Sequence, residues 1–77
     1  MLKTGIKIAG TDATAYIYDN GDTYIISIPY INFSLELSQA LPHEDQQDEI
    51  IAHLFHMMDE DECARIAEAI TNATDKQ

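Results

Sequence analysis

The segment TAYIYDNGDTYIISI, residues 14–28, decides the fold. Both of its ends are rich in β-branched and aromatic residues, which favour strands, and Asp-Asn-Gly-Asp at residues 19–22 separates them. Asn-Gly is a strong hairpin signal, because both residues tolerate the positive φ angles of a tight turn. With Asn20 and Gly21 as the loop, Asp19 is expected to lie opposite Asp22. The segment therefore predicts an antiparallel β-hairpin.

The two faces of this hairpin differ in composition. Side chains alternate across a strand, so one face is expected to carry Ala15, Ile17, Tyr24 and Ile26, and the other Tyr16, Tyr18, Thr23 and Ile25. One face must cover the core, which leaves surplus aromatic surface on the other. Tyr16 and Tyr18 are therefore candidate partner-binding residues.

Further strands are predicted on either side of the hairpin. Ile6 and Ile8 alternate with Lys7 and Ala9 in a short first strand that ends at Gly10. After Pro29, residues 31–38 alternate strictly, which predicts a strand with its apolar side chains inward; these are Ile31, Phe33, Leu35 and Leu37. A helix over residues 33–41 is the alternative, because Leu37 and Leu41 also fall at helical spacing.

The second half of the sequence has helical periodicity. Leu41-Pro42 marks a helix entry, and acidic residues follow where they complement the helix dipole. An apolar stripe then recurs at helical spacing through Ile50, Ile51, Leu54, Phe55 and Met58. A second helix is expected to begin at Asp59, with Glu62 completing a capping box, and to bury Cys63, Ile66, Ala67 and Ile70.

These elements predict an α+β fold in a single domain of residues 1–77. A three- to four-stranded antiparallel sheet is followed by two C-terminal helices packed on one of its faces. A chain of 77 residues is too short to hold a deep substrate cavity beside its core.

Acidic residues dominate the charge and are unevenly distributed. Fourteen acids against four basic residues give a net charge of -10. Residues 1–35 contribute -1 and residues 36–77 contribute -9, with no basic residue between Lys7 and Arg65. Direct nucleic-acid binding is disfavoured, because affinity for phosphate needs lysine and arginine. Acids without local partners are expected to be displayed outward, although many charged surfaces only keep a protein soluble.

Cysteine content and hydropathy indicate a cytoplasmic protein. The single cysteine, Cys63, permits no internal disulfide, and no apolar run has the length of a signal peptide or a membrane span.

The side chains that could support catalysis or metal binding favour neither. His53 and His56 lie near Glu49 and Glu60 on a helical surface, but the spacing differs from the zinc-peptidase motif and no second cluster completes a site. Cys63 falls on an inward stripe, where a thiol behaves as a small hydrophobe. Glycine-rich phosphate loops are absent from the sequence. We therefore expect no enzyme activity, no metal and no cofactor.

Three short stretches resemble small acidic anti-CRISPR proteins of Listeria prophages that inhibit type II-A Cas9. They are residues 7–12, residues 20–27 and the acidic run from Asp59 to Glu62. The resemblance implies a non-enzymatic, phage-encoded inhibitor that mimics nucleic acid and blocks a basic nucleic-acid-binding surface, such as that of a defence nuclease. It implies partner contacts by the acids at the hairpin turn and the helix junction: Asp19, Asp22, Asp59, Glu60, Asp61 and Glu62.

A second resemblance points to a different class of protein. Ile28-Pro29 and Phe33-Ser34 resemble the uncharacterised YueH-like proteins, a family that implies no function. The alternative hypothesis is therefore a cytosolic adaptor that binds its partner through the face carrying Tyr16 and Tyr18. Aromatic anchors would make such binding insensitive to salt, whereas binding through acids should weaken as salt is added.

Overall fold

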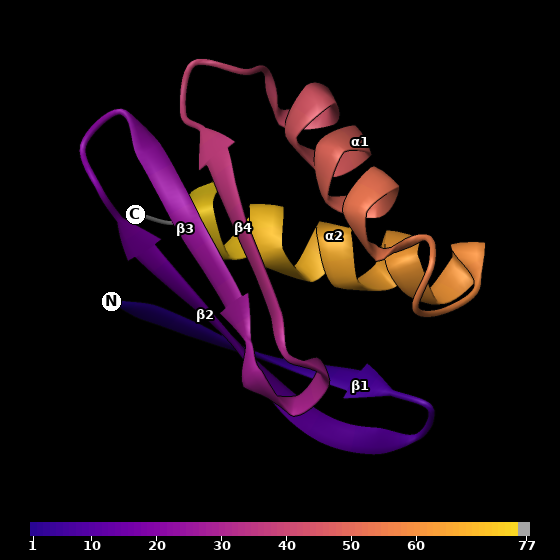
Figure 1. Cartoon of the computed structure of the whole chain (residues 1–77). Coiled ribbons are helices and arrows are strands. Elements are labelled where there is room, and N and C mark those ends of the chain that lie inside the picture. The colour runs from indigo at the N-terminus through magenta and orange to yellow at the C-terminus, as the bar shows by residue number, and fades with distance from the viewer. Residues whose placement is uncertain (76–77) are drawn as a thin grey trace.

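The computed structural model describes residues 1–75, and it confirms the predicted α+β fold (Figure 1). Four antiparallel strands lie side by side in the order in which they occur along the chain: β1 (Leu2–Ile8), β2 (Thr11–Asp19), β3 (Thr23–Ile28) and β4 (Phe33–Ser38). Helices α1 (His43–Leu54) and α2 (Glu60–Asp75) follow. In Figure 1, α2 passes behind the strands, while α1 lies on the β4 side. Helix α2 packs against β1 and α1, and α1 packs against β4.

The core lies between one face of the sheet and the two helices. Ala15, Ile17 and Ile26 are buried there, and Tyr24 packs partly against them, so the predicted inner face of the hairpin is confirmed. The helices contribute Ile50, Leu54, Cys63, Ile66, Ala67 and Ile70. The inward stripe predicted for the second helix is therefore also confirmed.

The predicted register of the β2–β3 hairpin is wrong by two residues. Asp19 lies opposite Tyr24, not Asp22, and the two loop residues are Gly21 and Asp22. Only the first of them, Gly21, has a positive φ, 85°, which is the pattern of a type II′ turn. A shift of two residues leaves every side chain on its predicted face, because side chains alternate with a period of two.

Ala9 and Gly10 form the two-residue loop of the β1–β2 hairpin. Ala9, expected in the first strand, instead occupies the loop, since Ile8 pairs directly with Thr11. Both loop residues have positive φ, 51° at Ala9 and 82° at Gly10, as a type I′ turn requires. Alanine is strained in this region, because its Cβ approaches the following carbonyl oxygen.

The segment after Pro29 forms a strand, and the alternative of a helix over residues 33–41 is wrong. Phe33, Leu35 and Leu37 are buried and alternate with exposed residues, as predicted. The strand begins two residues later than expected, because a 3-10 turn over Pro29–Ile31 precedes it and Asn32 adopts a left-handed conformation. Ile31 nevertheless packs partly against the core.

The ends of α1 differ from the sequence-based prediction. Pro42 occupies the position before the first helical residue and not the first turn itself. The helix ends at Leu54, so Phe55 caps it and is 59% exposed instead of joining the apolar stripe. Ile51 and Met58, expected in the same stripe, are only half-buried.

Candidate interaction surfaces

The outer face of the sheet, opposite the helices, carries three neighbouring apolar side chains: Tyr16, Tyr18 and Ile25. We call them the aromatic face. Tyr18 lies directly opposite Ile25 across β2 and β3, and Tyr16 lies one step along β2 on the same side. Tyr18 is 51% exposed, whereas Tyr16 and Ile25 are half-buried. The predicted grouping of Tyr16, Tyr18 and Ile25 on one face is therefore present.

Charged side chains flank the aromatic face on both sides. Lys3 on β1 lies opposite Tyr16, and Glu36 on β4 lies opposite Ile25. The Glu36 carboxylate accepts a hydrogen bond of 3.0 Å from the Thr23 hydroxyl, which holds it against the strand. An apolar centre with a polar rim is the common anatomy of protein–protein interfaces.

The two predicted contact acids at the hairpin turn differ in their surroundings. Asp19 Oδ1 accepts hydrogen bonds from the Gln39 side-chain amide, at 2.8 Å, and from the Gly21 N–H, at 3.0 Å. These bonds, led by that from Gln39, lower the pKa of Asp19 below its usual value, so the carboxylate is held ionised. Asp22 accepts the Gln39 backbone N–H with its carbonyl oxygen, at 2.9 Å, and its side chain is exposed.

Two of the four acids at the start of α2 stabilise the fold directly. Asp59 Oδ1 accepts the Glu62 N–H at 2.8 Å, which confirms Asp59 as the N-cap. The Glu62 carboxylate does not complete the predicted capping box; its oxygens accept the Ala9 N–H of the β1–β2 turn, at 3.2 and 3.3 Å. Its side chain is only 15% exposed. Glu60 and Asp61 are exposed on the first turn of the helix.

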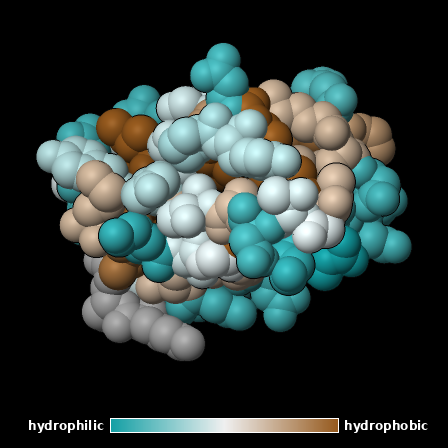
Figure 2. Space-filling view, turned by 90° about the horizontal axis from the view of Figure 1, so that it is seen from below, coloured by the Kyte–Doolittle hydropathy of each residue, from teal (hydrophilic) through white to brown (hydrophobic). Residues whose placement is uncertain are grey.

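The six predicted contact acids do not form one surface. In Figure 1 the β2–β3 turn lies at the upper left, and the start of α2 lies at the opposite side of the molecule. Residues 43–75 nevertheless contain ten of the fourteen acids and a single basic residue, Arg65. Negative charge is therefore concentrated on the helical half and does not cover the whole molecule. Viewed from below, the surface shows brown hydrophobic atoms between pale and teal residues (Figure 2).

Cys63 is buried in the core, and the predicted pair of helix histidines is divided, because His53 lies on α1 whereas His56 lies in the turn after the helix ends. Cys63 is fully buried, and burial, with smaller contributions from Asp59 and Glu62, raises the pKa of its thiol, which disfavours the nucleophilic thiolate. His53 Nδ1 lies 2.8 Å from the Glu49 carbonyl oxygen of its own helix. Within the described part of the chain, no three histidine, cysteine or acidic side chains are grouped to hold a metal ion. In the same residues, no helix is long and apolar enough to cross a membrane.

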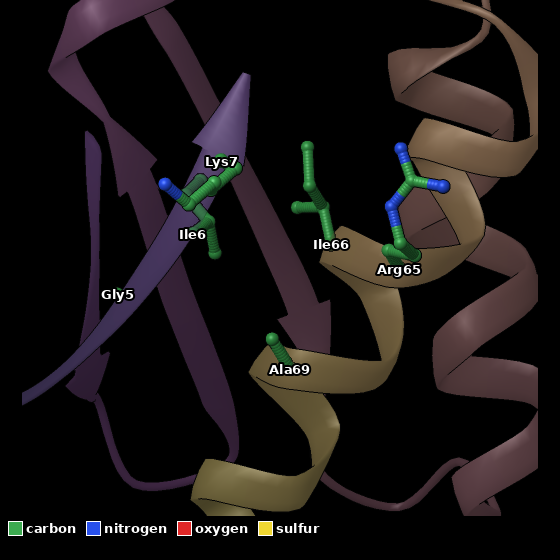
Figure 3. Close-up of a pocket in the computed structure, with 6 residues that line it drawn as sticks. All are labelled: Gly5, Ile6, Lys7, Arg65, Ile66 and Ala69. Atoms are coloured by element: carbon green, nitrogen blue, oxygen red, sulfur yellow. The ribbon is translucent and has the colours of Figure 1, made fainter. Parts of the chain in front are cut away.

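Sequence reasoning missed two surface features. One is a groove between β1 and α2 that is lined by Gly5, Ile6, Lys7, Arg65, Ile66 and Ala69 (Figure 3). Its two walls are about 60 residues apart in the sequence, and no local pattern signals that they meet. The other is the exposure of Phe55 and Met57, 59% and 50%, where α1 joins α2.

Comparison with known families accounts for nearly the whole chain. The family model described as YueH-like protein matches residues 2–76. The chain belongs to the YueH-like family. The family description states no activity, so membership assigns no function by itself. No curated protein and no solved structure matches the chain.

Proposed function

We propose that this YueH-like protein is a non-enzymatic interaction protein that binds a protein partner through the aromatic face. The observation that carries the proposal is the position of Tyr16, Tyr18 and Ile25. They lie together on the side of the sheet opposite both helices, in a molecule whose remaining apolar strand residues are used by the core. Tyrosine suits such a role, since its ring supplies contact area and its hydroxyl tolerates water when the partner is absent.

Replacement of the two tyrosines tests this proposal. The protein is immobilised, a partner is captured from cell extract and purified, and its affinity is measured for the parent and for Tyr16→Ala/Tyr18→Ala. We expect a loss of about tenfold or more, as is typical for aromatic anchors at an interface. Phe55→Ala is the matched control, because Phe55 is an exposed aromatic residue outside the sheet. Equal affinity of the double variant and the parent, with both folded by circular dichroism, would contradict the proposal.

A second candidate function rests on the charge of the helical half. The ten acids of residues 43–75 would bind a basic protein surface, such as the nucleic-acid-binding site of a nuclease, by mimicking the phosphate backbone. This is the inhibitor role that the anti-CRISPR resemblance implies. Its partner is a protein, and it requires no nucleic acid and no membrane.

Substituting acids that do not stabilise the fold distinguishes between the two candidate functions. Glu60→Gln/Asp61→Asn removes two exposed charges and leaves the Asp59 cap and the Glu62 bond to Ala9 intact. Mimicry predicts that this variant binds the partner more weakly and that added salt weakens the parent complex. Binding that is insensitive to both changes would exclude mimicry and favour the aromatic face.

A further inference from the structure

Strand β1 is an edge strand whose outer side is open. It pairs only with β2 among the described residues, in a register set by the two-residue turn at Ala9 and Gly10. In such a hairpin the pair that closes the turn, Ile8 and Thr11, exchanges both backbone hydrogen bonds, and the pattern alternates from there. The N–H and C=O groups of Lys3, Gly5 and Lys7 therefore point away from β2, toward the open side. These three residues can accept another strand.

A groove runs beside this edge, between β1 and α2. Figure 3 shows β1 and α2 facing one another across it, with Ile66 and Ala69 on the helix and Ile6 and Lys7 on the strand. The hollow measures about 300 Å³. A second hollow of about 410 Å³ continues along the same edge, where Leu2, Lys3 and Thr4 face Ala69, Asn72 and Ala73. The small side chains of Ala69 and Ala73 leave room beside the strand for another chain.

Gly5 lies at the centre of the open edge, and the fold does not require a glycine there. Its φ is not positive, unlike those of Gly10 and Gly21, and a Cβ atom added to it would meet no atom within 4 Å. Glycine weakens a strand, because it is flexible and has no side chain to pack. A glycine within an edge strand allows a neighbouring backbone or a large side chain to approach closely.

Positive charge is concentrated at the same edge. The chain has four lysine and arginine residues, and three of them line the two hollows: Lys3, Lys7 and Arg65. Lys7 pairs with Asp12 at 3.0 Å, but both side chains are largely exposed, so this ion pair is weak and exchangeable. Arg65 lies 3.8 Å from Glu62, so Lys3 and Lys7 are the cations that a ligand at the edge would meet on β1. At physiological salt the Debye length is about 8 Å, so acids farther away than this are largely screened.

We propose that β1 binds an extended acidic segment of a partner protein, which adds to the sheet as a fifth, antiparallel strand. Carboxylates of the segment lie opposite Lys3 and Lys7, and an aromatic side chain lies over Gly5, in the pattern acid–x–aromatic–x–acid. The intervening residues face the groove, so they are small and apolar. This binding mode uses the backbone edge of the sheet, and its outward side chains adjoin the aromatic face at Lys3, which lies opposite Tyr16.

A second copy of this chain is a poorer occupant of the edge. Antiparallel self-pairing centred on Gly5 would place Lys3 of each copy opposite Lys7 of the other, and like charges in directly opposite positions are destabilising. Lysines on an edge strand are a known means of preventing such self-association. The same lysines attract a strand that carries carboxylates.

A designed peptide provides the test. Its core sequence is Glu-Val-Phe-Val-Glu, which is the same in both directions. It is titrated into the full chain and followed by amide NMR and hydrogen exchange. We expect shifts at residues 2–8 and along the facing side of α2, with slowed exchange of the Lys3, Gly5 and Lys7 amides, because strand addition gives them hydrogen-bond acceptors.

Charge reversal supplies a matched pair of measurements. Lys3→Glu/Lys7→Glu should weaken binding of the glutamate peptide by about tenfold or more, since two cross-strand attractions become repulsions. A peptide with lysines in place of both glutamates should bind this variant and not the parent. Tyr18→Ala, a change on the aromatic face, should leave the glutamate peptide bound as tightly as before.

Three results would overturn the proposal. The first is the absence of binding at millimolar peptide. The second is binding whose shifts lie away from β1 and α2, or that ignores the charge reversal. The third is protection of the Lys3, Gly5 and Lys7 amides without peptide in a species that sediments as a dimer, which would assign the edge to a second copy.

Discussion

At the scale of single residues, Gln39 stabilises the hairpin turn although it lies outside the hairpin. Its side-chain amide donates to Asp19 Oδ1 at 2.8 Å and to the Thr23 carbonyl oxygen at 3.0 Å, and its backbone N–H donates to the Asp22 carbonyl oxygen. A residue just after β4 thus holds both sides of the β2–β3 turn. This contact explains why Asp19 is ionised more readily than a free aspartate.

Gln39→Leu should raise the pKa of Asp19. The bond from Gln39 is the largest cause of the lowered value, and the Gly21 N–H remains as a smaller one. A pKa that is lowered by folding stabilises the native state above the usual aspartate value of 3.8, and this contribution disappears as pH falls through the lowered pKa. Carboxylate NMR titration of both proteins measures the change. An unchanged Asp19 pKa would show that the side-chain bond is not formed in solution.

Ala9 and Gly10 form a turn that suits glycine at both positions. Ala9→Gly should increase the free energy of unfolding by about 0.5 kcal/mol, because relief of the positive φ exceeds the extra entropy of the unfolded glycine. Gly10→Ala should decrease it by about 1 kcal/mol, since an alanine there adopts a φ of 82°. Gly5→Ala is the control without positive φ and should not destabilise. Urea unfolding ranks the three variants, and a stabilising Gly10→Ala would refute the turn assignment.

At the scale of elements, Glu62 joins the first turn of the sheet to the start of the last helix. Its carboxylate accepts the Ala9 N–H, and its own N–H donates to the Asp59 cap. The two residues, Ala9 and Glu62, are 53 positions apart. One side chain therefore fixes α2 across the end of the β1–β2 hairpin.

Glu62→Ala should destabilise the protein by about 1 kcal/mol, because the Ala9 N–H loses its charged acceptor and only water can replace it. Glu60→Ala, a change to an exposed acid on the same helical turn, should alter stability by no more than about 0.5 kcal/mol. Chemical denaturation of both variants measures the difference. Equal effects would mean that Glu62 acts only as part of the charge at the helix terminus.

The sequence predicts the elements better than their junctions. Faces of strands follow from local alternation, so the burial of Ile17 and Ile26 and the exposure of Tyr18 were predictable. Asp-Asn-Gly-Asp, however, allows two positions for a two-residue loop, and bonds from the distant Gln39 favour Gly21-Asp22. Phe55 continues a helical stripe in sequence, but the helix has already ended. The groove at Gly5 depends on packing between the two ends of the chain, which no local pattern encodes.

At the scale of the whole molecule, acidic, basic and aromatic side chains are unevenly distributed. The helical half carries ten of the fourteen acids, the outer face of the sheet carries Tyr16 and Tyr18, and β1 carries two of the four basic residues. A net charge of -10 on 77 residues repels itself in the compact state. The molecule therefore presents chemically distinct surfaces, and repulsion among its acids lowers the stability of the compact state.

Added salt should stabilise the protein against heat. Raising sodium chloride from about 10 mM to 150 mM shortens the Debye length from about 30 Å to about 8 Å, which screens repulsion among the acids. We expect Tm to rise by several degrees, since about 1 kcal/mol shifts Tm by about 4–8 °C in a domain of this size. Glu60→Gln/Asp61→Asn should show a smaller rise, because two of the repelling charges are gone. A Tm that falls with salt would mean that attractive ion pairs outweigh the repulsion.

The order of the elements along the chain also determines the order in which they are synthesised. The four strands precede both helices in the sequence and can pair before the helices are made, because each is hydrogen-bonded to its neighbour in sequence. Their inner face, which includes Ile17, Ile28 and Leu35, is then an open apolar surface. Helix α1 packs against β4 and helix α2 against β1, and α2 is the last of the described elements in the sequence. Until α2 is synthesised, the inner face beside β1 therefore stays exposed, and such exposed apolar surface promotes aggregation.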